Sequence, residues 1–397
     1  MDQAETSEGV SDSAGSSRSV SEILFEPVRI GSLELANRVV MAPMSRRFAQ
    51  DGILPDASAD YYARRARENV GLIISECTGV GHPSALRLPS YPSFHGHEAL
   101  GQWRKVIDAV HAAGGRMMPQ IWHAGATKLV GSVPNPEIPP ASPSGLFIPI
   151  DGQGSDPERA GEPLGESDLA DIIAAFGQAA ADAMALGFDG VEIHGAHGYL
   201  IDQFLWPRMN RRADRWGPAG AEAATAFAAE IVAECRRRTG PDFPLFFRFS
   251  QWKQQDFRAT LASGPAALEA LLRPLVDAGV TLLHTSLRRY WEAAFSSDPM
   301  TLAGWTRKLT GLPVCTVGSV GLDQEFGKGD GGRKGGVAYG SQPVSIDRLA
   351  ALFERGEFDL VAVGRVLISD HRWATKVREG RFSEHVPYST ADLDTLV

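Results

Sequence analysis

The chain has 397 residues, of which 43% are hydrophobic and 22% charged, a composition that excludes a largely disordered or membrane-spanning protein. The formal net charge of −9 disfavours nucleic acid or an anionic membrane as a partner and favours a small-molecule substrate. The three cysteines, Cys77, Cys235 and Cys315, have no metal-type spacing, which predicts reduced thiols and a cytoplasmic location.

The first 22 residues differ from the rest of the chain. They contain seven serines and no apolar stretch of the kind that a signal peptide needs. We therefore expect residues 1–22 to form a disordered leader, with an interaction tail as the alternative, and residues 23–397 to form a single domain.

After the leader, short apolar runs alternate with amphipathic helical stretches, the pattern of βαβ units around a parallel sheet. The clearest helix covers residues 168–186, where Leu169, Ile172 and Phe176 follow the helical period and Gly187 stands at the C-cap. The strand candidates are residues 38–42, 70–75, 116–121, 188–194, 244–250, 280–285, 313–317 and 359–364.

Eight such strands favour a closed (β/α)₈ TIM barrel, because an open sheet would leave a hydrophobic edge at each end. Two long insertions interrupt the alternation. Residues 124–165 contain eight prolines and no sustained period, which is typical of an ordered loop over a barrel mouth; a surface excursion is the alternative. Residues 323–344 include GKGDGGRKGG, whose glycines and lysines could suggest a phosphate loop. The segment does not follow a strand and open a helix, so a flexible solvated loop is favoured instead.

In a barrel of this type the reacting groups lie at the C-terminal ends of the strands. The fourth predicted strand ends in a segment with two histidines and a tyrosine, His194, His197 and Tyr199. Imidazole N–H groups can hold a carbonyl or nitro oxygen and stabilise the negative charge that develops there, and a phenol can donate a proton. On these residues alone two alternatives stay open: a zinc site with Asp202 as a third ligand, and histidines with a purely structural role.

The segment HGAHGYLIDQFLWPRMNRRADRWG (194–217) resembles the active-site signature of the old yellow enzyme family. Other blocks of that family follow in the same order, so that the resemblance covers about residues 22–380. They are LFEPVRIGSLELANRVVMAPMSR (24–46), GLIISECTGV (71–80), PQIWHAG (119–125), FFRFSQW (246–252), VCTVGSVG (314–321) and DLVAVGRVLISD (359–370). The resemblance implies a TIM barrel with an N-terminal hairpin and with FMN, tightly bound, at its C-terminal mouth.

Carried over by position, the resemblance makes His194 and His197 the pair that grips the substrate and Tyr199 the proton donor. Gln120 and Arg248 match positions that bind the flavin pyrimidine, where a guanidinium would stabilise negative charge. Trp122 matches a residue that faces the substrate, with core packing as the alternative. Trp252, Tyr290 and Trp291 are weaker candidates for the mouth. The remaining expected flavin contacts are Pro43, Met44, Ser45 and Cys77 at the ring, and Gly318, Ser319, Gly364 and Arg365 at the phosphate.

Some positions depart from the family pattern. Ser45 stands where many relatives have Thr or Cys, and Cys77 replaces a small residue beside the ring, where the thiol either touches the flavin or fills space. Ala126 follows HAG where many relatives carry Arg, and GPAGAEA (217–223) lacks the usual GGS and the Arg that follows it. These changes affect the expected pocket shape and subunit contacts.

The sequence thus predicts an FMN-dependent oxidoreductase, with NADPH or NADH as donor, that reduces the C=C bond of α,β-unsaturated carbonyl or nitro compounds. The chain also lacks the cysteine cluster of the family's larger iron–sulfur members, so we expect an enzyme with FMN alone, as a monomer or homodimer. Alternatives are a nitro or nitrate-ester reductase, a desaturase, a zinc hydrolase built on the two histidines, and a barrel that only binds. Arg288 and Arg289 are candidates for a nicotinamide phosphate, with a solvated charge pair as the alternative.

Overall fold

Eight parallel strands close into a barrel in the computed structural model, which describes residues 18–128, 131–296, 298–325 and 340–396. All eight predicted strands are present, and the predicted (β/α)₈ barrel is confirmed. Around the barrel the strands are β3 (Val39–Met41), β4 (Leu72–Gly79), β5 (Met117–Trp122), β8 (Val191–His194), β9 (Leu245–Ser250), β10 (Leu282–Ser286), β13 (Val314–Val317) and β15 (Leu360–Val363).

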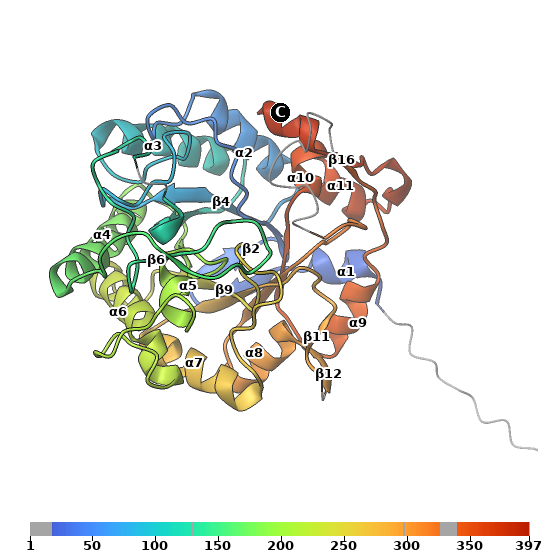
Figure 1. The fold of residues 1–397 in the computed structure, drawn as a ribbon. Helices are drawn as coiled ribbons and strands as arrows, with labels where there is room; N and C mark the ends of the chain where they lie inside the picture. Colours follow the sequence, from blue (N-terminus) through green and yellow to red (C-terminus); the bar gives the residue numbers. More distant parts are fainter. Residues whose placement is uncertain (1–17, 129–130, 297, 326–339, 397) are drawn as a thin grey trace, which may run out of the picture.

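Helices surround the barrel and connect successive strands (Figure 1). The predicted helix at 168–186 is α4, and it ends in a Schellman motif: Gly187 has φ 81°, and the N–H groups of Gly187 and Phe188 donate to the carbonyls of Met184 and Ala183, each at 3.0 Å. The helices are α2 (Ala57–Arg67), α3 (His97–Ala112), α4 (Glu166–Ala185), α5 (Leu200–Leu205), α6 (Ala221–Thr239), α7 (Pro265–Asp277), α8 (Leu302–Thr310), α9 (Arg348–Glu354), α10 (Val366–Ser369) and α11 (Trp373–Arg378).

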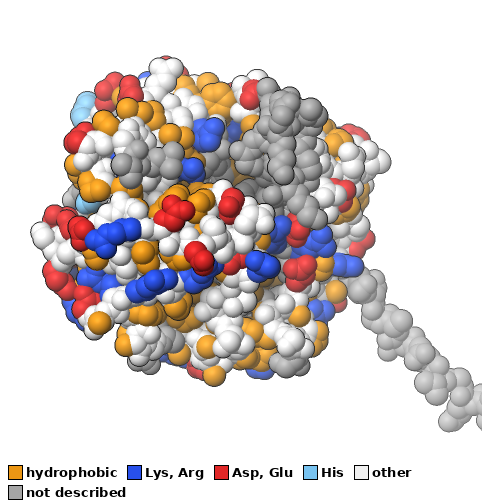
Figure 2. All heavy atoms as spheres, viewed as in Figure 1, with side chains coloured by type: hydrophobic (Ala, Val, Ile, Leu, Met, Phe, Trp, Pro, Cys, Tyr) orange, Lys and Arg blue, Asp and Glu red, His pale blue; other side chains and the backbone are white. Residues whose placement is uncertain are grey.

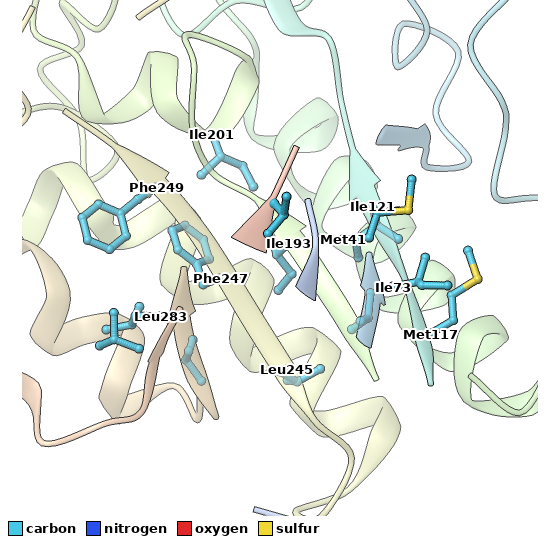
Figure 3. Packing of buried hydrophobic residues seen from close by; sticks show 14 of the residues in the cluster. Met41, Ile73, Met117, Ile121, Ile193, Ile201, Leu245, Phe247, Phe249 and Leu283 are labelled. Atoms are coloured by element: carbon cyan, nitrogen blue, oxygen red, sulfur yellow. The ribbon is translucent and has the colours of Figure 1, made fainter. Parts of the chain in front are cut away.

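The main core lies between the barrel and its helices. Along β9, Leu245, Phe247 and Phe249 are buried and belong to this core, as Ile193 of β8 and Leu283 of β10 do. Figure 3 shows these side chains packed together with others of the cluster. Since side chains alternate along a strand, the residues between them point into the barrel.

The N-terminal end of the barrel is closed by an apolar plug. The hairpin of β1 (Val28–Ile30) and β2 (Leu33–Leu35) packs its buried residues Ile30, Leu33 and Leu35 against the inner side of the barrel. The barrel-strand residues in this cluster are Val40, Leu72, Ile74, Met118, Phe246, Leu282, Cys315, Val317, Leu360 and Ala362. The predicted hairpin is therefore present, and it leaves the C-terminal end as the open one.

The folded part begins earlier than the predicted boundary at residue 23. Helix α1 (Val20–Leu24) starts after Ser19, whose side chain accepts from the N–H of Glu22 while Glu22 accepts from the N–H of Ser19. Val20, Ile23 and Leu24 are buried, so residues 20–22 belong to the domain rather than to the leader. Residues 1–17 of the predicted leader lie outside the described residues.

The insertion at 124–165 is ordered where it is described. It contains a 3₁₀ turn at Gly125–Thr127 and a small hairpin of β6 (Leu146–Phe147) and β7 (Glu158–Arg159). The buried Nζ of Lys128 donates to the carbonyls of Asn135 and Ile138 at 3.0 and 2.9 Å, which holds the loop to itself.

Smaller antiparallel pairs of strands complete the fold. One is the hairpin of β11 (Ala293–Phe295) with β12 (Asp298–Thr301); in addition, β14 (Gly340–Ser341) pairs antiparallel with β16 (Tyr388–Ser389), which lies much later in the chain. Most of the predicted flexible loop at 323–344 falls on residues 326–339, outside the described residues. In the part of the chain that is described, no helix has the length and apolar character to cross a bilayer. Acidic and basic side chains are interspersed on the face seen in Figure 2.

Candidate active site

A cavity of about 600 Å³ lies at the C-terminal end of the barrel, within the size range of ligand pockets. Residues at or just after the ends of all eight strands line it. With the exception of Trp122, it brings together every residue that the sequence analysis selected for catalysis and cofactor binding: Pro43, Met44, Ser45, Cys77, Gln120, His194, His197, Tyr199, Arg248, Gly318, Ser319, Gly364 and Arg365.

The two imidazoles lie beside each other, with ring centroids 5.1 Å apart. Burial, and then the nearby Arg248 guanidinium, lower the pKa of both His194 and His197 well below the usual value, so both rings are neutral at pH 7. Nδ1 of His194 accepts from the N–H of Ala196 at 3.3 Å, which leaves the proton on Nε2. Nε2 of His197 lies 2.7 Å from Oγ of Ser286. His194 is therefore a ready N–H donor at the cavity.

The turn that carries His197 is held in an uncommon backbone conformation. His197 and Gly198 have φ of 65° and 76°, and a Cβ at position 198 would lie 1.8 Å from the Gln255 side chain, so only glycine fits there. Asp202 accepts from the N–H of Gly198 at 2.7 Å and pairs with Nζ of Lys253 at 2.7 Å, both side chains being fully buried.

This geometry argues against the zinc alternative. Both carboxylate oxygens of Asp202 are engaged by Gly198 and Lys253, so Asp202 is not a third ligand beside His194 and His197. Among the described residues, no three His, Cys, Asp or Glu side chains are grouped so that they could hold a metal.

Tyr199 lies at the start of α5, and its side chain is only 6% exposed. Its ring lies edge-on to His194, with centroids 5.2 Å apart. Burial raises the pKa of the Tyr199 phenol well above its usual range, so the phenol carries its proton at neutral pH. Gln254 donates a hydrogen bond of 3.0 Å to the phenol oxygen.

Below the imidazoles, the inner wall of the barrel is polar. Nε2 of Gln120 donates to Glu192 at 2.7 Å, and Nδ1 of His284 lies 2.6 Å from the other oxygen of the same carboxylate. Nη2 of Arg248 donates to Ser286 at 3.2 Å, while its buried Nε has no partner among the described residues. Glu192, His284 and Ser286 were not predicted from the sequence. The signal was present, because each lies two residues along its strand from another inward residue, and residues two apart point to the same side.

Cys77 reaches the cavity through a β-bulge. Ile74 pairs with Met118 but Cys77 pairs with Gln120, so β4 has one extra residue that reverses the alternation and turns Glu76 outward. The Cys77 thiol lies 3.3 Å from Oγ of Ser45, and burial raises its pKa to about 12, which keeps it protonated. The thiol is therefore a neutral wall group rather than a thiolate.

The seventh and eighth strands end beside each other on the far side of the cavity. Gly318 has φ 157°, and a Cβ there would lie 2.6 Å from the carbonyl of Leu287, so the close approach of two loops requires glycine. The Arg365 guanidinium donates to the Gln324 carbonyl at 2.6 Å and reaches Oγ of Ser319 at 3.4 Å. Gly318, Ser319, Gly364 and Arg365, which the sequence predicts at the phosphate, thus form one side of the cavity.

Three predictions about aromatic residues need correction. Trp122 is fully buried and packs edge-on behind Tyr199, with centroids 5.2 Å apart, instead of lining the cavity. Tyr290 and Trp291 pack on each other, with ring centroids 4.9 Å apart, and neither lines the cavity, although the N–H of Tyr290 donates to the carbonyl of the lining residue Gly318 at 3.1 Å. Trp252 does line the cavity, where its ring lies 4.6 Å from that of His197.

The long insertion and Arg288 also differ from the sequence expectations. None of the described residues of 124–165 lines the cavity; Ala126 and Ile148 pack on Trp206 instead. Arg288 does line the cavity, but it is paired with Glu325 at 3.0 Å and lies over the Phe257 ring, so it is not a solvated charge.

The C-terminal segment supplies a wall that the sequence did not suggest. Tyr388, Thr390, Leu393 and Asp394 line the cavity. The Arg46 guanidinium anchors this segment by donating to the Asp392 carbonyl at 2.9 Å. No motif in the sequence marks these residues, because the contact joins positions far apart in the chain.

The fold and the cavity define a class: a TIM-barrel protein whose ligand site lies at the C-terminal mouth. The sequence model of the NADH:flavin oxidoreductase / NADH oxidase family matches residues 23–329. "NADH oxidase" of Thermoanaerobacter brockii is 33% identical over 370 residues, which are 91% of this chain and 51% of that protein. The chain therefore spans about half the length of this relative.

Comparison with solved structures leads to the same family. Morphinone reductase in complex with tetrahydroNAD superposes with a TM-score of 0.72 at 27% identity, and the match covers 90% of both chains. The old yellow enzyme homologue of Zymomonas mobilis gives a TM-score of 0.71 at 25% identity and covers 90% of this chain and 92% of its own. The chain belongs to the NADH:flavin oxidoreductase family of old yellow enzyme, whose members use FMN as cofactor and NAD(P)H as donor.

The cavity fits this cofactor chemically. Nε of Arg248 is a buried N–H donor without a partner in the described residues, and such a group needs an acceptor, as the electronegative edge of a flavin would provide. A carboxylate accepts hydrogen bonds, so the Gln120 side chain turns its NH₂ group toward Glu192. The amide oxygen of Gln120 is then left to accept from a hydrogen-bond donor in the cavity.

Proposed function

We propose that this protein is an ene-reductase, which reduces the C=C bond of α,β-unsaturated carbonyl or nitro compounds. One observation carries the proposal: a protonated phenol and two neutral imidazoles from one turn face the same cavity as Gln120 and Arg248. A hydrogen-bond donor for an oxyanion and a proton source for carbon are the two protein groups that this reduction needs.

FMN, when bound, would supply the hydride, with a nicotinamide as its source. Nε2–H of His194, with His197 beside it, holds the carbonyl or nitro oxygen of the substrate and stabilises the negative charge that develops on it. Tyr199 gives its proton to the α-carbon, so that the substrate gains one hydride and one proton. Ser286 fixes the ring of His197, and the pair of Lys253 with Asp202 fixes the turn.

The residues that would hold the cofactor belong to the same proposal. Gln120 and Arg248 would bind the pyrimidine edge of the ring, and Pro43, Met44, Ser45 and Cys77 would line it. The ends of β13 and β15, with Gly318, Ser319, Gly364 and Arg365, would hold the phosphate.

The test separates the two half-reactions by stopped-flow spectroscopy of Tyr199→Phe. Reoxidation of the reduced enzyme by a cyclic enone should slow by about 10²–10⁴-fold, the usual contribution of a general acid, and flavin reduction by NADH or NADPH should change little. A panel of cyclic enones, maleimides, nitroalkenes and nitrate esters checks the substrate class. Turnover of the nitrate esters alone, or equal reoxidation rates in both proteins, contradicts the proposal.

A further inference from the structure

Gln254 is a residue at the cavity for which the sequence analysis had no role. It lies in the loop after β9, is half-buried, and lines the same cavity as Tyr199. Its side-chain Nε2 donates to the Tyr199 phenol oxygen at 3.0 Å, and among the described residues no other hydrogen bond reaches that oxygen. The phenol is thus an acceptor toward Gln254, so its own proton stays free for another group.

The loop that carries Gln254 is fixed to the turn that carries Tyr199. The backbone N–H of Gln254 donates to the His197 carbonyl at 3.3 Å. On either side, Lys253 is buried in its ion pair with Asp202, and Gln255 donates to the Gly198 carbonyl at 2.9 Å. These contacts hold the Gln254 carboxamide against the phenol without help from a ligand.

The position of Gln254 matters for the fate of the phenol after it loses its proton. The transfer breaks the O–H bond of Tyr199 and forms a C–H bond at the substrate α-carbon; the electron pair stays on the phenolate oxygen, which water then reprotonates. An N–H donor that already points at this oxygen becomes a charge-assisted hydrogen bond as the negative charge appears. Tyr91, Cys77 and Trp122 also surround Tyr199, but among the described residues none of them makes a hydrogen bond to the phenol oxygen.

We propose that Gln254 is a positioning residue for proton transfer: it orients the Tyr199 phenol with its proton toward the substrate and stabilises the phenolate that transfer leaves behind. This inference rests on the proposed function, because it needs Tyr199 to be the proton donor. It adds a polar residue from a second loop to the predicted set of two histidines and one tyrosine.

The test is a double-mutant cycle read in the two half-reactions of the FMN-loaded enzyme. Gln254→Leu should slow reoxidation by an enone about 10- to 100-fold, the value of one hydrogen bond to a charged group, and raise the solvent deuterium isotope effect on that step. Flavin reduction, FMN content and melting temperature should stay close to wild type. In a Tyr199→Phe background the same change should have no further effect on reoxidation.

The control is Gln251→Leu in the same loop. The Gln251 side chain accepts from the N–H of Leu261 at 2.6 Å and does not line the cavity, so its loss should leave the reoxidation rate unchanged. Gln254→Glu provides a second variant should the leucine protein fold poorly. A carboxylate accepts the phenol proton and repels a phenolate, so reoxidation should be slower than in the wild type.

The outcomes separate the two proposals. Equal reoxidation rates in Tyr199→Phe and wild type overturn the proposed function. A slow Tyr199→Phe protein with a fast Gln254→Leu protein overturns the role of Gln254 alone. So does a Gln254→Leu effect that persists undiminished in the Tyr199→Phe background, because Gln254 would then act through another group.

Discussion

The two ends of the barrel interior are built by the same strands from opposite kinds of residue. At the N-terminal end, Phe246 of β9 and Leu282 of β10 are fully buried against the hairpin. Two residues further along, the inward positions of these strands hold Arg248 and His284. Because alternation puts residues two apart on the same side, the change from apolar to polar occurs within one pleat repeat.

The difference shows which end of the barrel interior raises the free energy of unfolding and which end lowers it. Apolar side chains at the closed end contribute by leaving water, whereas buried polar groups at the open end are costly unless they are bonded. At the open end some stay incomplete: Nε of Arg248 and Nε2 of His284 have no partner in the described part of the protein. A site that must bind a polar cofactor explains why such groups are kept there.

The largest expected effect would come from the closed end. Phe246→Ala should lower the free energy of unfolding by about 3–5 kcal/mol, because it removes a fully buried ring and leaves a cavity. Urea denaturation followed by circular dichroism measures this change. Phe246→Leu is the control, and its loss of unfolding free energy should be smaller. The half-reactions of the folded fraction should change little. An unfolding midpoint equal to that of the wild type would show that Phe246 at the closed end does not contribute this stability.

The open end should show the reverse pattern. His194→Ala should slow reoxidation by an enone about 10²–10³-fold, as loss of one oxyanion donor does, with a smaller loss of stability than Phe246→Ala. His194→Asn, which keeps an N–H donor, should recover part of the rate. Stopped-flow traces and melting curves of the same preparations give both quantities. A stability loss without a rate loss would assign His194 to the core.

A smaller effect concerns Glu76, which the bulge in β4 turns away from the cavity. Its carboxylate accepts from the N–H groups of Arg46 and Arg47 at 2.9 and 3.2 Å, and burial raises its pKa to about 7. Since the folded pKa lies above the unfolded value of 4.5, Glu76 stabilises the protein below about pH 4.5 and loses this contribution as pH rises through 7.

The matched variant is Glu76→Gln, whose amide oxygen can accept the same two N–H groups. The unfolding free energy of the wild type, relative to this variant, should fall by about 2–3 kcal/mol between pH 5 and pH 8. Urea titrations of both proteins across that range measure the difference. Parallel pH dependences would show that Glu76 does not titrate in the folded state over this range.

Much of the fold could be predicted because its signals are local. The eight strands are short apolar runs, and α4 has both a regular apolar face and a glycine where its Schellman motif requires one. The observed boundaries differ from the predicted ones by a few residues where contacts between distant parts of the chain determine them. The start of α1 is one case, since Val20 and Ile23 are buried by the rest of the domain.

The composition of the site was predictable from motifs, and its arrangement was not. His194, His197 and Tyr199 lie on one short segment, so their grouping follows from the sequence. Gln254 and the C-terminal wall with Leu393 reach the cavity only because the barrel closes. Trp122 was misplaced because family position does not say whether a side chain lies in front of Tyr199 or behind it.

By itself, the sequence determined the alternation of strands and helices and the residues that stand at the strand ends, because these depend on neighbours a few positions away. Only the tertiary structure decided which of those residues share a cavity, which acid pairs with Lys253, and which amide donates to Tyr199. These contacts join separate strands and loops, and closure of the barrel, which buries the apolar surface of every strand at once, brings them together.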